Sequence, residues 1–325
     1  ATIVGLLLAL AYPDRVARRR EGSADRYQLA HGRGARLVTG DPLTGRDWLV
    51  AAQLDASGNE GRIWLAAAVD PADLEQHLSS RVHTVAKVSW DERQAVVLTR
   101  RERRLDALLL DSAPLQEADP ASLRQAMLTG IRQMGLSSLP WTPELRDWQA
   151  RLLSAHHWFP DEGWPEVADH RLMERLEVWL EPWLEGITRR EHLARLDLPS
   201  ALQSLLDHRL RARLNELAPT HLSVPSGSRI RLRYTPGEPP VLAVKLQELF
   251  GLADTPRIAG GRIPVTLHLL SPAQRPIQVT QDLRGFWERT YAEVKKELKG
   301  RYPKHPWPDD PWTATPTRRA RPARS

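Results

Sequence analysis

Three clusters of basic side chains have the type and spacing to bind an anionic polymer. Arg229, Arg231 and Arg233 alternate with apolar residues, so a strand through them would project all three guanidinium groups from one face. The other clusters comprise Arg100, Arg101, Arg103 and Arg104, and then Lys295, Lys296, Lys299, Arg301 and Lys304. Such rows can neutralise phosphates, but basic faces are also often only solvated, so both interpretations stay open.

Catalytic motifs for nucleotide hydrolysis are missing from the sequence. A phosphate-binding loop needs a glycine-rich segment that ends in Lys-Ser or Lys-Thr, and the chain has none. Asp161-Glu162 resemble the start of a DEAH box, but Pro160 precedes them and Gly163-Trp164 follow, where a buried strand and Ala-His are required. We therefore expect no catalytic residue in this chain.

Other polar groupings favour structural roles. His156 and His157 lie near Asp161, Glu162 and His170, but adjacent histidines on a helix diverge, and no HExxH spacing exists. A solvated helix end is the favoured interpretation there, and proline-locked packing is favoured for His305, Asp309 and Asp310. Ser223, Ser226 and Ser228 do not sit on a nucleophile elbow. The sequence therefore predicts no metal and no cofactor in this chain.

Composition sets wide bounds on function. The chain has 325 residues, so two or three domains are expected. Lys and Arg number 46 against 40 Asp and Glu, and the formal charge of +6 permits an anionic partner without requiring one. The absence of cysteine excludes disulfides, thiolate metal sites and cysteine nucleophiles, and it fits a reducing, cytoplasmic location.

An apolar segment near the N-terminus, residues 3–11, resembles the core of a signal peptide. The basic residues that should precede such a core are absent, and Arg15, Arg18, Arg19 and Arg20 follow it instead. The segment is also too short to span a bilayer. We interpret residues 3–20 as a helix taken from a larger protein, and we expect no membrane contact.

The pattern of elements predicts an α+β protein in four parts. Residues 1–112 read as a helix followed by an OB-like β-barrel with extra strands, with a short helix from Pro71 to about Leu78. Residues 113–218 show helical spacing, including a capping box of Ser200 and Gln203 before a run of leucines. Residues 219–300 form a mixed α+β domain, and residues 301–325 are a Pro-rich basic tail.

Two features of the third part carry specific expectations. A last helix over residues 283–298 should bury a stripe of Leu283, Trp287, Tyr291, Val294 and Leu298. Gly227, Gly260 and Gly261 lie between strand-like runs and should serve backbone turns rather than hold a ligand.

A series of ordered motifs resembles one protein family. Residues 8–17, 27–30 and 32–35 resemble the OB-fold segment of HrpB-type DEAH-box helicases. The resemblance becomes more specific toward the C-terminus, at residues 219–222, 224–229, 246–252, 259–262, 269–272, 285–287 and 300–308. It covers essentially the whole chain.

The resemblance implies a longer protein with two RecA-like motor domains, a winged helix and a helical bundle upstream. ATP, Mg²⁺ and unwinding would belong to those parts, with which this chain would associate. We therefore expect the non-motor C-terminal portion of an ATP-dependent helicase. This portion would guide single-stranded nucleic acid, which we expect to be RNA, or regulate the motor. The residues expected to contact nucleic acid are Arg229, Arg231, Arg233, Arg257, Arg262 and Lys304.

Two rival interpretations remain at this stage. A protein-interaction scaffold without nucleic-acid contact is favoured by the acidic residues that interleave with the basic clusters, whereas the Arg229 row favours nucleic-acid binding. An independent enzyme is disfavoured by the missing catalytic motifs.

Overall fold

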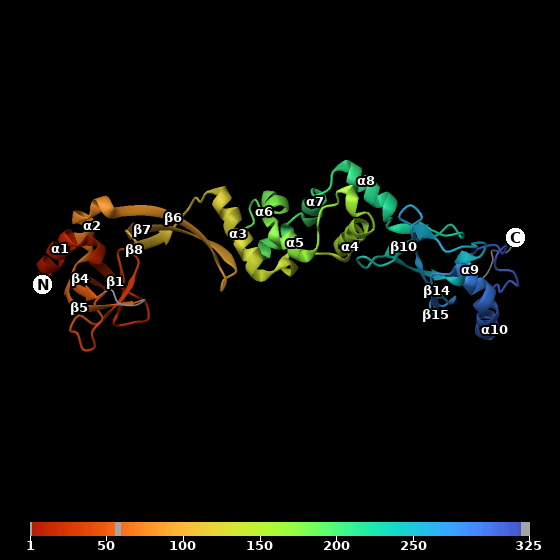
Figure 1. Cartoon of the computed structure of the whole chain (residues 1–325), viewed down its shortest axis with the longest axis horizontal. Coiled ribbons are helices and arrows are strands. Elements are labelled where there is room, and N and C mark those ends of the chain that lie inside the picture. The colour runs from red at the N-terminus through yellow and green to blue at the C-terminus, as the bar shows by residue number, and fades with distance from the viewer. Residues whose placement is uncertain (1, 56–59, 320–325) are drawn as a thin grey trace. The chain divides into compact units, whose positions relative to one another are not determined.

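The computed structural model describes residues 2–55 and 60–319, and Figure 1 labels its elements. Contacts within the chain define two compact units. The first unit contains residues 1–133 and 186–190, and the second contains residues 134–185 and 191–325. The sequence also predicts a turn at Ser57-Gly58-Asn59, which lies outside the described residues, as do Arg321 and Arg324 of the basic tail.

A closed five-stranded barrel, in the order β1-β2-β3-β5-β4, forms the start of the first unit. Its strands are β1 (Val16–Arg19), β2 (Arg26–Leu29), β3 (Gly34–Leu37), β4 (Trp48–Asp55) and β5 (Glu60–Ala68). Only β3 and β5 run parallel, and β4 pairs with β1 to close the ring. Tyr27, Leu49 and Ile63 fill the interior. This confirms the predicted N-terminal β-barrel.

The N-terminal helix is shorter than predicted. Helix α1 (Thr2–Ala11) ends well before Arg20, and Val16–Arg19 is barrel strand β1. Pro13 starts a short 3₁₀ turn after the helix, because proline lacks the N–H that a continuing helix would use. Val16 and Ala17 are fully buried, so their burial favours the strand over a longer helix.

A separate three-stranded sheet follows the barrel, in the order β6-β7-β8. Its strands are β6 (Val82–Asp91), β7 (Val96–Leu105) and β8 (Leu108–Pro114). They are preceded by helix α2 (Pro71–His77), which begins as predicted and is capped by Asp70, whose carboxylate accepts a hydrogen bond from Ala72 N at 2.8 Å. The extra strands expected after the barrel are therefore present.

The middle of the chain is helical, as predicted. The helices are α3 (Pro120–Met134), α4 (Pro143–Trp158), α5 (Asp169–Glu174), α6 (Leu176–Trp179), α7 (Leu198–Gln203) and α8 (His208–Leu217). The predicted capping box is wrong, because Asp197, not Ser200, caps α7 by accepting from Ser200 N at 3.1 Å. The run of leucines is also divided, because Asp207 caps a second helix, α8. An aspartate closer to each helix start competes better for the free N–H groups.

A mixed five-stranded sheet forms the C-terminal part of the second unit, in the order β15-β14-β11-β10-β9. Its strands are β9 (His221–Ser223), β10 (Arg229–Arg233), β11 (Val241–Lys245), β14 (Thr266–Leu270) and β15 (Pro276–Thr280). A small hairpin of β12 (Arg257–Ile258) and β13 (Ile263–Pro264) lies between β11 and β14 in sequence. This confirms the mixed α+β architecture.

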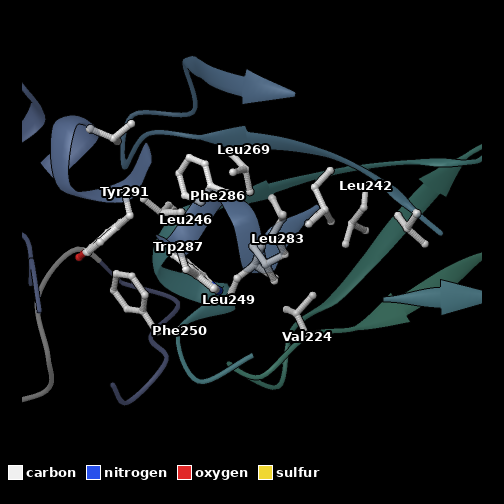
Figure 2. Close-up of a cluster of buried hydrophobic side chains, with 14 of the residues drawn as sticks. Val224, Leu242, Leu246, Leu249, Phe250, Leu269, Leu283, Phe286, Trp287 and Tyr291 are labelled. Carbon is white, nitrogen blue, oxygen red and sulfur yellow. The ribbon is translucent and has the colours of Figure 1, made fainter. Parts of the chain in front are cut away.

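The last helical segment packs on one face of this sheet. It comprises α9 (Leu283–Gly285), a π-helical turn (Phe286–Thr290) and α10 (Tyr291–Arg301). The predicted stripe of Leu283, Trp287, Tyr291, Val294 and Leu298 is buried, in one core with sheet residues such as Leu242 and Leu269. Figure 2 shows Trp287 and Tyr291 beside Phe250 in this core.

The prediction that three glycines serve backbone turns is confirmed by their backbone conformation. Gly227, Gly260 and Gly261 have φ angles of 81°, 63° and 84°, a region that glycine adopts without steric cost. Among the described residues, no helix combines the length and apolar character needed to cross a membrane.

Candidate nucleic-acid interface

The three arginines of β10 occupy one face of the C-terminal sheet. Arg229, Arg231 and Arg233 are exposed, Ile230 between them is half-buried, and Leu232 is fully buried in the core. The face that carries the arginines is therefore opposite the face packed by α9 and α10. We call it the outer face of the sheet.

Neighbouring strands add polar and basic side chains to the outer face. His221 of β9 lies directly opposite Arg231, and Ser223 lies opposite Arg229. Val241 of β11 pairs with Arg233, so Lys245, four residues on, shares the same face. His268 of β14 reaches that face because it pairs with Ala243.

No carboxylate opposes these cations from within the sheet. The strands β9, β10, β11, β14 and β15 all lie in the described part of the chain, and none of them contains Asp or Glu. Like charges that lie directly opposite each other on neighbouring strands destabilise a sheet. The three arginines instead lie on one strand, where their spacing keeps them apart. The charged side chains that the strands themselves place on the outer face are therefore all basic.

Arg231 differs from its two neighbours because helix α4 supplies a partner. Its guanidinium lies 3.6 Å from the carboxylate of Asp147. Burial raises the pKa of the Asp147 carboxyl above its ordinary value, although the charge of Arg231 acts in the opposite direction. Arg229 and Arg233 form no ion pair with any residue that the structure describes.

The other predicted contact residues are dispersed. Arg257 turns back onto its own hairpin, where Nε donates to Gly261 O at 2.6 Å and Nη2 donates to Arg262 O at 3.2 Å. The Arg262 guanidinium stacks 4.7 Å from the ring centroid of Phe159. Lys304 is exposed beyond α10, and within the described residues no hydrogen bond or ion pair joins it to β10.

A groove beside helix α8 was not predicted. It has a volume of about 800 Å³ and is lined by Asp161, Glu162, Arg209 and Arg213, among others. Arg213 binds Glu162 at 2.9 Å and Glu216 at 3.2 Å, so both signs of charge line this groove. The alternation of residues 241–245 and 266–270 could have identified Lys245 and His268 on the outer face, whereas nothing local in the sequence indicates this groove.

Some members of the remaining basic clusters form ion pairs. On β7, Arg103 binds both Glu75 at 2.6 Å and Asp111 at 2.8 Å, and Arg104 binds Glu102 at 2.7 Å. In the cluster that begins on α10, Lys295 pairs with Asp309. These contacts give those cations structural roles.

The three histidines that were considered as metal ligands lie along a shallow groove. His156, His157 and His170 border it together with Glu166, and its volume is about 410 Å³. In the described ranges, no three His, Cys, Asp or Glu side chains come together in a way that could hold a metal ion. The pair Asp161-Glu162 lies in a 3₁₀ turn rather than after a buried strand.

Helix α1 presents a second kind of surface. Ile3, Leu7 and Leu10 are exposed, and their spacing places them along one side of the helix. On the opposite side, Ala9 is fully buried, and the backbone of Gly5 lies so close to Ala68 O that a Cβ there would be 2.0 Å from it. An apolar stripe of this kind is typical of a surface that contacts another part of a protein.

Comparisons with known proteins agree with the architecture. A family model described as "ATP-dependent helicase C-terminal" matches residues 179–311. The ATP-dependent RNA helicase HrpB of Escherichia coli (strain K12) is 46% identical over 323 residues, which is 99% of this chain and 40% of that relative. This chain therefore spans less than half the length of that curated relative.

Two solved structures resemble this chain. The crystal structure of the E. coli DExH-box NTPase HrpB matches with a TM-score of 0.63 and 46% identity, over 98% of this chain and 39% of that one. The crystal structure of the Escherichia coli DEAH/RHA helicase HrpB matches with a TM-score of 0.55 and 41% identity, over 94% of this chain and 38% of that one. Together with the family match, this near-complete coverage shows that the chain belongs to the HrpB family of helicases and represents its C-terminal region.

Proposed function

We propose that this chain is the non-motor portion of an ATP-dependent RNA helicase and that the outer face of its C-terminal sheet guides single-stranded nucleic acid. The observation that supports this most strongly is the row on β10, where Arg229 and Arg233 are exposed without an ion-pair partner among the described residues. None of the five strands around them carries a carboxylate in the described structure.

The spacing of the row suits an extended nucleic-acid strand. A β-strand advances about 3.3 Å per residue, so alternate side chains on one face lie about 6.6 Å apart. Successive phosphates of an extended single strand have a similar spacing, so one arginine can meet one phosphate. Lys245 and His268 widen the surface across two further strands. Phosphate contacts of this type bind strands of any sequence and position them.

Motor functions belong to the rest of such a helicase in this proposal. ATP and Mg²⁺ would bind outside this chain, and the cysteine-free composition together with the helicase relative supports a cytoplasmic location. The apolar stripe of α1, formed by Ile3, Leu7 and Leu10, would contact the motor portion. Purified chain should therefore show no ATP turnover of its own.

A second candidate function is a scaffold that binds protein and never nucleic acid. The pair between Arg231 and Asp147 favours it, because that pair uses one member of the row for internal structure. Fluorescence anisotropy with a labelled single-stranded RNA, at several salt concentrations, separates the two. Binding that weakens steeply with salt supports the guiding function, and no binding at low salt by either the chain or the complete helicase contradicts it.

A further inference from the structure

The outer edge of strand β6 has no partner strand in the described part of the chain. β6 pairs with β7 through ten consecutive residues without a bulge, and the sheet order β6-β7-β8 leaves its other side open. In an antiparallel ladder, every second residue of an edge strand points its N–H and C=O groups away from the sheet. Residues 83–87 of β6 are also exposed on both faces.

The opposite edge of the same sheet is protected, which makes the open edge of β6 distinctive. The pairing of β8 with β7 shifts register between Arg103 and Arg104, and β8 ends at Pro114. Bulges, prolines and short length are the usual means by which proteins prevent unwanted strand pairing. β6 has neither bulge nor proline, and its ten residues are long for an edge strand.

Contacts at both ends hold β6 in an extended conformation. At one end, the Trp90 ring packs so closely on α3 that a Cβ at Gly130 would be 2.5 Å from it, and Trp90 Nε1 donates to Gln133 Oε1 at 3.3 Å. Beyond the β6–β7 turn, Val97 N donates to Thr188 O at 2.8 Å. At the other end, Arg81 binds Asp106 at 2.6 Å. A strand held in this way loses little conformational entropy on binding a partner.

The charged residues at the middle of the paired strands β6 and β7 indicate what kind of segment would pair with the open edge of β6. Lys87 and Arg100 lie directly opposite each other on one face, and Arg101 lies opposite Ala86 on the other face. The nearby acidic group is Glu102, which is buried and already shared by Lys87 at 3.7 Å and Arg104 at 2.7 Å. Exposed cations therefore flank the edge on both faces.

The distribution of these cations favours a peptide over nucleic acid. A phosphate backbone lying on one face would meet the cations of that face alone. A peptide strand that pairs with β6 places alternate side chains on both faces, where acidic residues could meet Lys87 and Arg100 on one side and Arg101 on the other. Main-chain hydrogen bonds would provide affinity and the side chains specificity.

We propose that β6 binds an extended, acidic segment of a partner protein as a fourth strand of the β6-β7-β8 sheet. This interaction is independent of the nucleic-acid face on the C-terminal sheet, because β6 belongs to the first unit and β10 to the second.

Hydrogen–deuterium exchange on the full chain tests the proposal with a synthetic probe. The probe is a short peptide of repeated Glu-Glu-Thr-Val, which places glutamates on both faces when extended. We expect slowed exchange at alternate amides of residues 83–89. The same peptide carrying N-methyl groups on alternate amides along one edge should bind no longer, because it cannot form the ladder. Lys87→Glu should weaken binding by about fivefold to tenfold.

Controls separate the proposal from its rivals. Arg93→Glu makes the same charge change at the exposed turn beyond β6 and should leave binding unchanged. If Lys87→Glu fails to fold, Lys87→Gln takes its place in the binding test, and its unfolding temperature is measured to show that it is folded. Equal binding by the N-methylated peptide overturns the proposal, as does protection of β6 by single-stranded RNA instead of peptide. Protection that rises with protein concentration alone would indicate a second copy of this chain and also overturn it.

Discussion

The guanidinium of Arg231 lies 3.6 Å from the carboxylate of Asp147, whose side chain is only 14% exposed. This pair joins strand β10 to helix α4 and divides the arginine row by role. Arg231 compensates a largely buried charge, whereas Arg229 and Arg233 point to solvent without an ion pair among the described residues. Stability and binding should therefore depend on different members of the row.

Replacing Arg231 by alanine should destabilise the second unit more than replacing Arg229. Arg231→Ala leaves the Asp147 carboxylate without its partner, which we expect to cost roughly 1 kcal/mol, since the arginine itself is partly exposed and screened. Arg229→Ala should change the free energy of unfolding by less than about 0.5 kcal/mol. Urea denaturation measures both, and equal losses for the two variants would contradict the assigned roles.

The stability of the chain should carry a pH dependence from Asp147. Its pKa is raised in the folded state, chiefly by burial, so the folded protein binds this proton more tightly than the unfolded chain does. The contribution of Asp147 to the free energy of unfolding is therefore fully present below the pKa that this carboxyl has in the unfolded chain. It is lost as pH rises through the pKa that the carboxyl has in the folded protein. Asp147→Asn should then be more destabilising near pH 3 than at pH 7. Urea denaturation at both pH values checks this, and a difference of the opposite sign would refute it.

The contact between Trp90 and Gly130 should tolerate no side chain on the helix. A Cβ at position 130 would lie 2.5 to 2.7 Å from indole atoms of Trp90, so Gly130→Ala should destabilise the first unit by about 1–3 kcal/mol. Gly300→Ala is the matched control, because Gly300 lies in α10 and a Cβ added there would meet no atom within 4 Å. That change should stabilise by about 0.5–1 kcal/mol. Thermal unfolding of both variants measures these changes. An unchanged unfolding temperature for Gly130→Ala would contradict the prediction.

Local sequence patterns predicted the parts of the fold that local physics decides. The alternation around Arg231 predicted the face of β10, and the stripe through Trp287 predicted the buried side of the last helix. The end of α1 was missed, because Val16 pairs with Val50 of β4 and is buried in a cluster with residues far along the chain, such as Leu74.

Contacts between distant segments explain what could not be predicted of the site. Asp147 reaches Arg231 from a helix more than eighty residues earlier, and no pattern near either residue indicates the pair. The same holds for Arg262, whose stacking on Phe159 depends on how the β12–β13 hairpin meets the end of α4. A charged residue at regular spacing identifies a face, but its partners depend on tertiary structure.

The apolar stripe of α1 should matter in the complete helicase more than in this chain. Leu7 is 62% exposed, so Leu7→Glu should leave the unfolding temperature of the isolated chain nearly unchanged. In the complete helicase the same change should lower it, because the glutamate would enter an apolar contact with the motor portion. Ala9→Glu is the control, since Ala9 is fully buried and its substitution should destabilise the isolated chain directly. A loss from Leu7→Glu in the isolated chain alone would argue against the motor contact.

The salt dependence of single-stranded RNA binding tests the guiding function most directly. Each phosphate contact on a single strand contributes about 0.7 to the slope of log K against log salt, so Arg229→Ala combined with Arg233→Ala should reduce that slope by about 1.4. Arg231→Ala, whose side chain is engaged with Asp147, should change the slope much less. If the double variant folds normally and binds RNA with the same affinity and the same slope as the unsubstituted chain, the outer face of the C-terminal sheet is not the guiding surface.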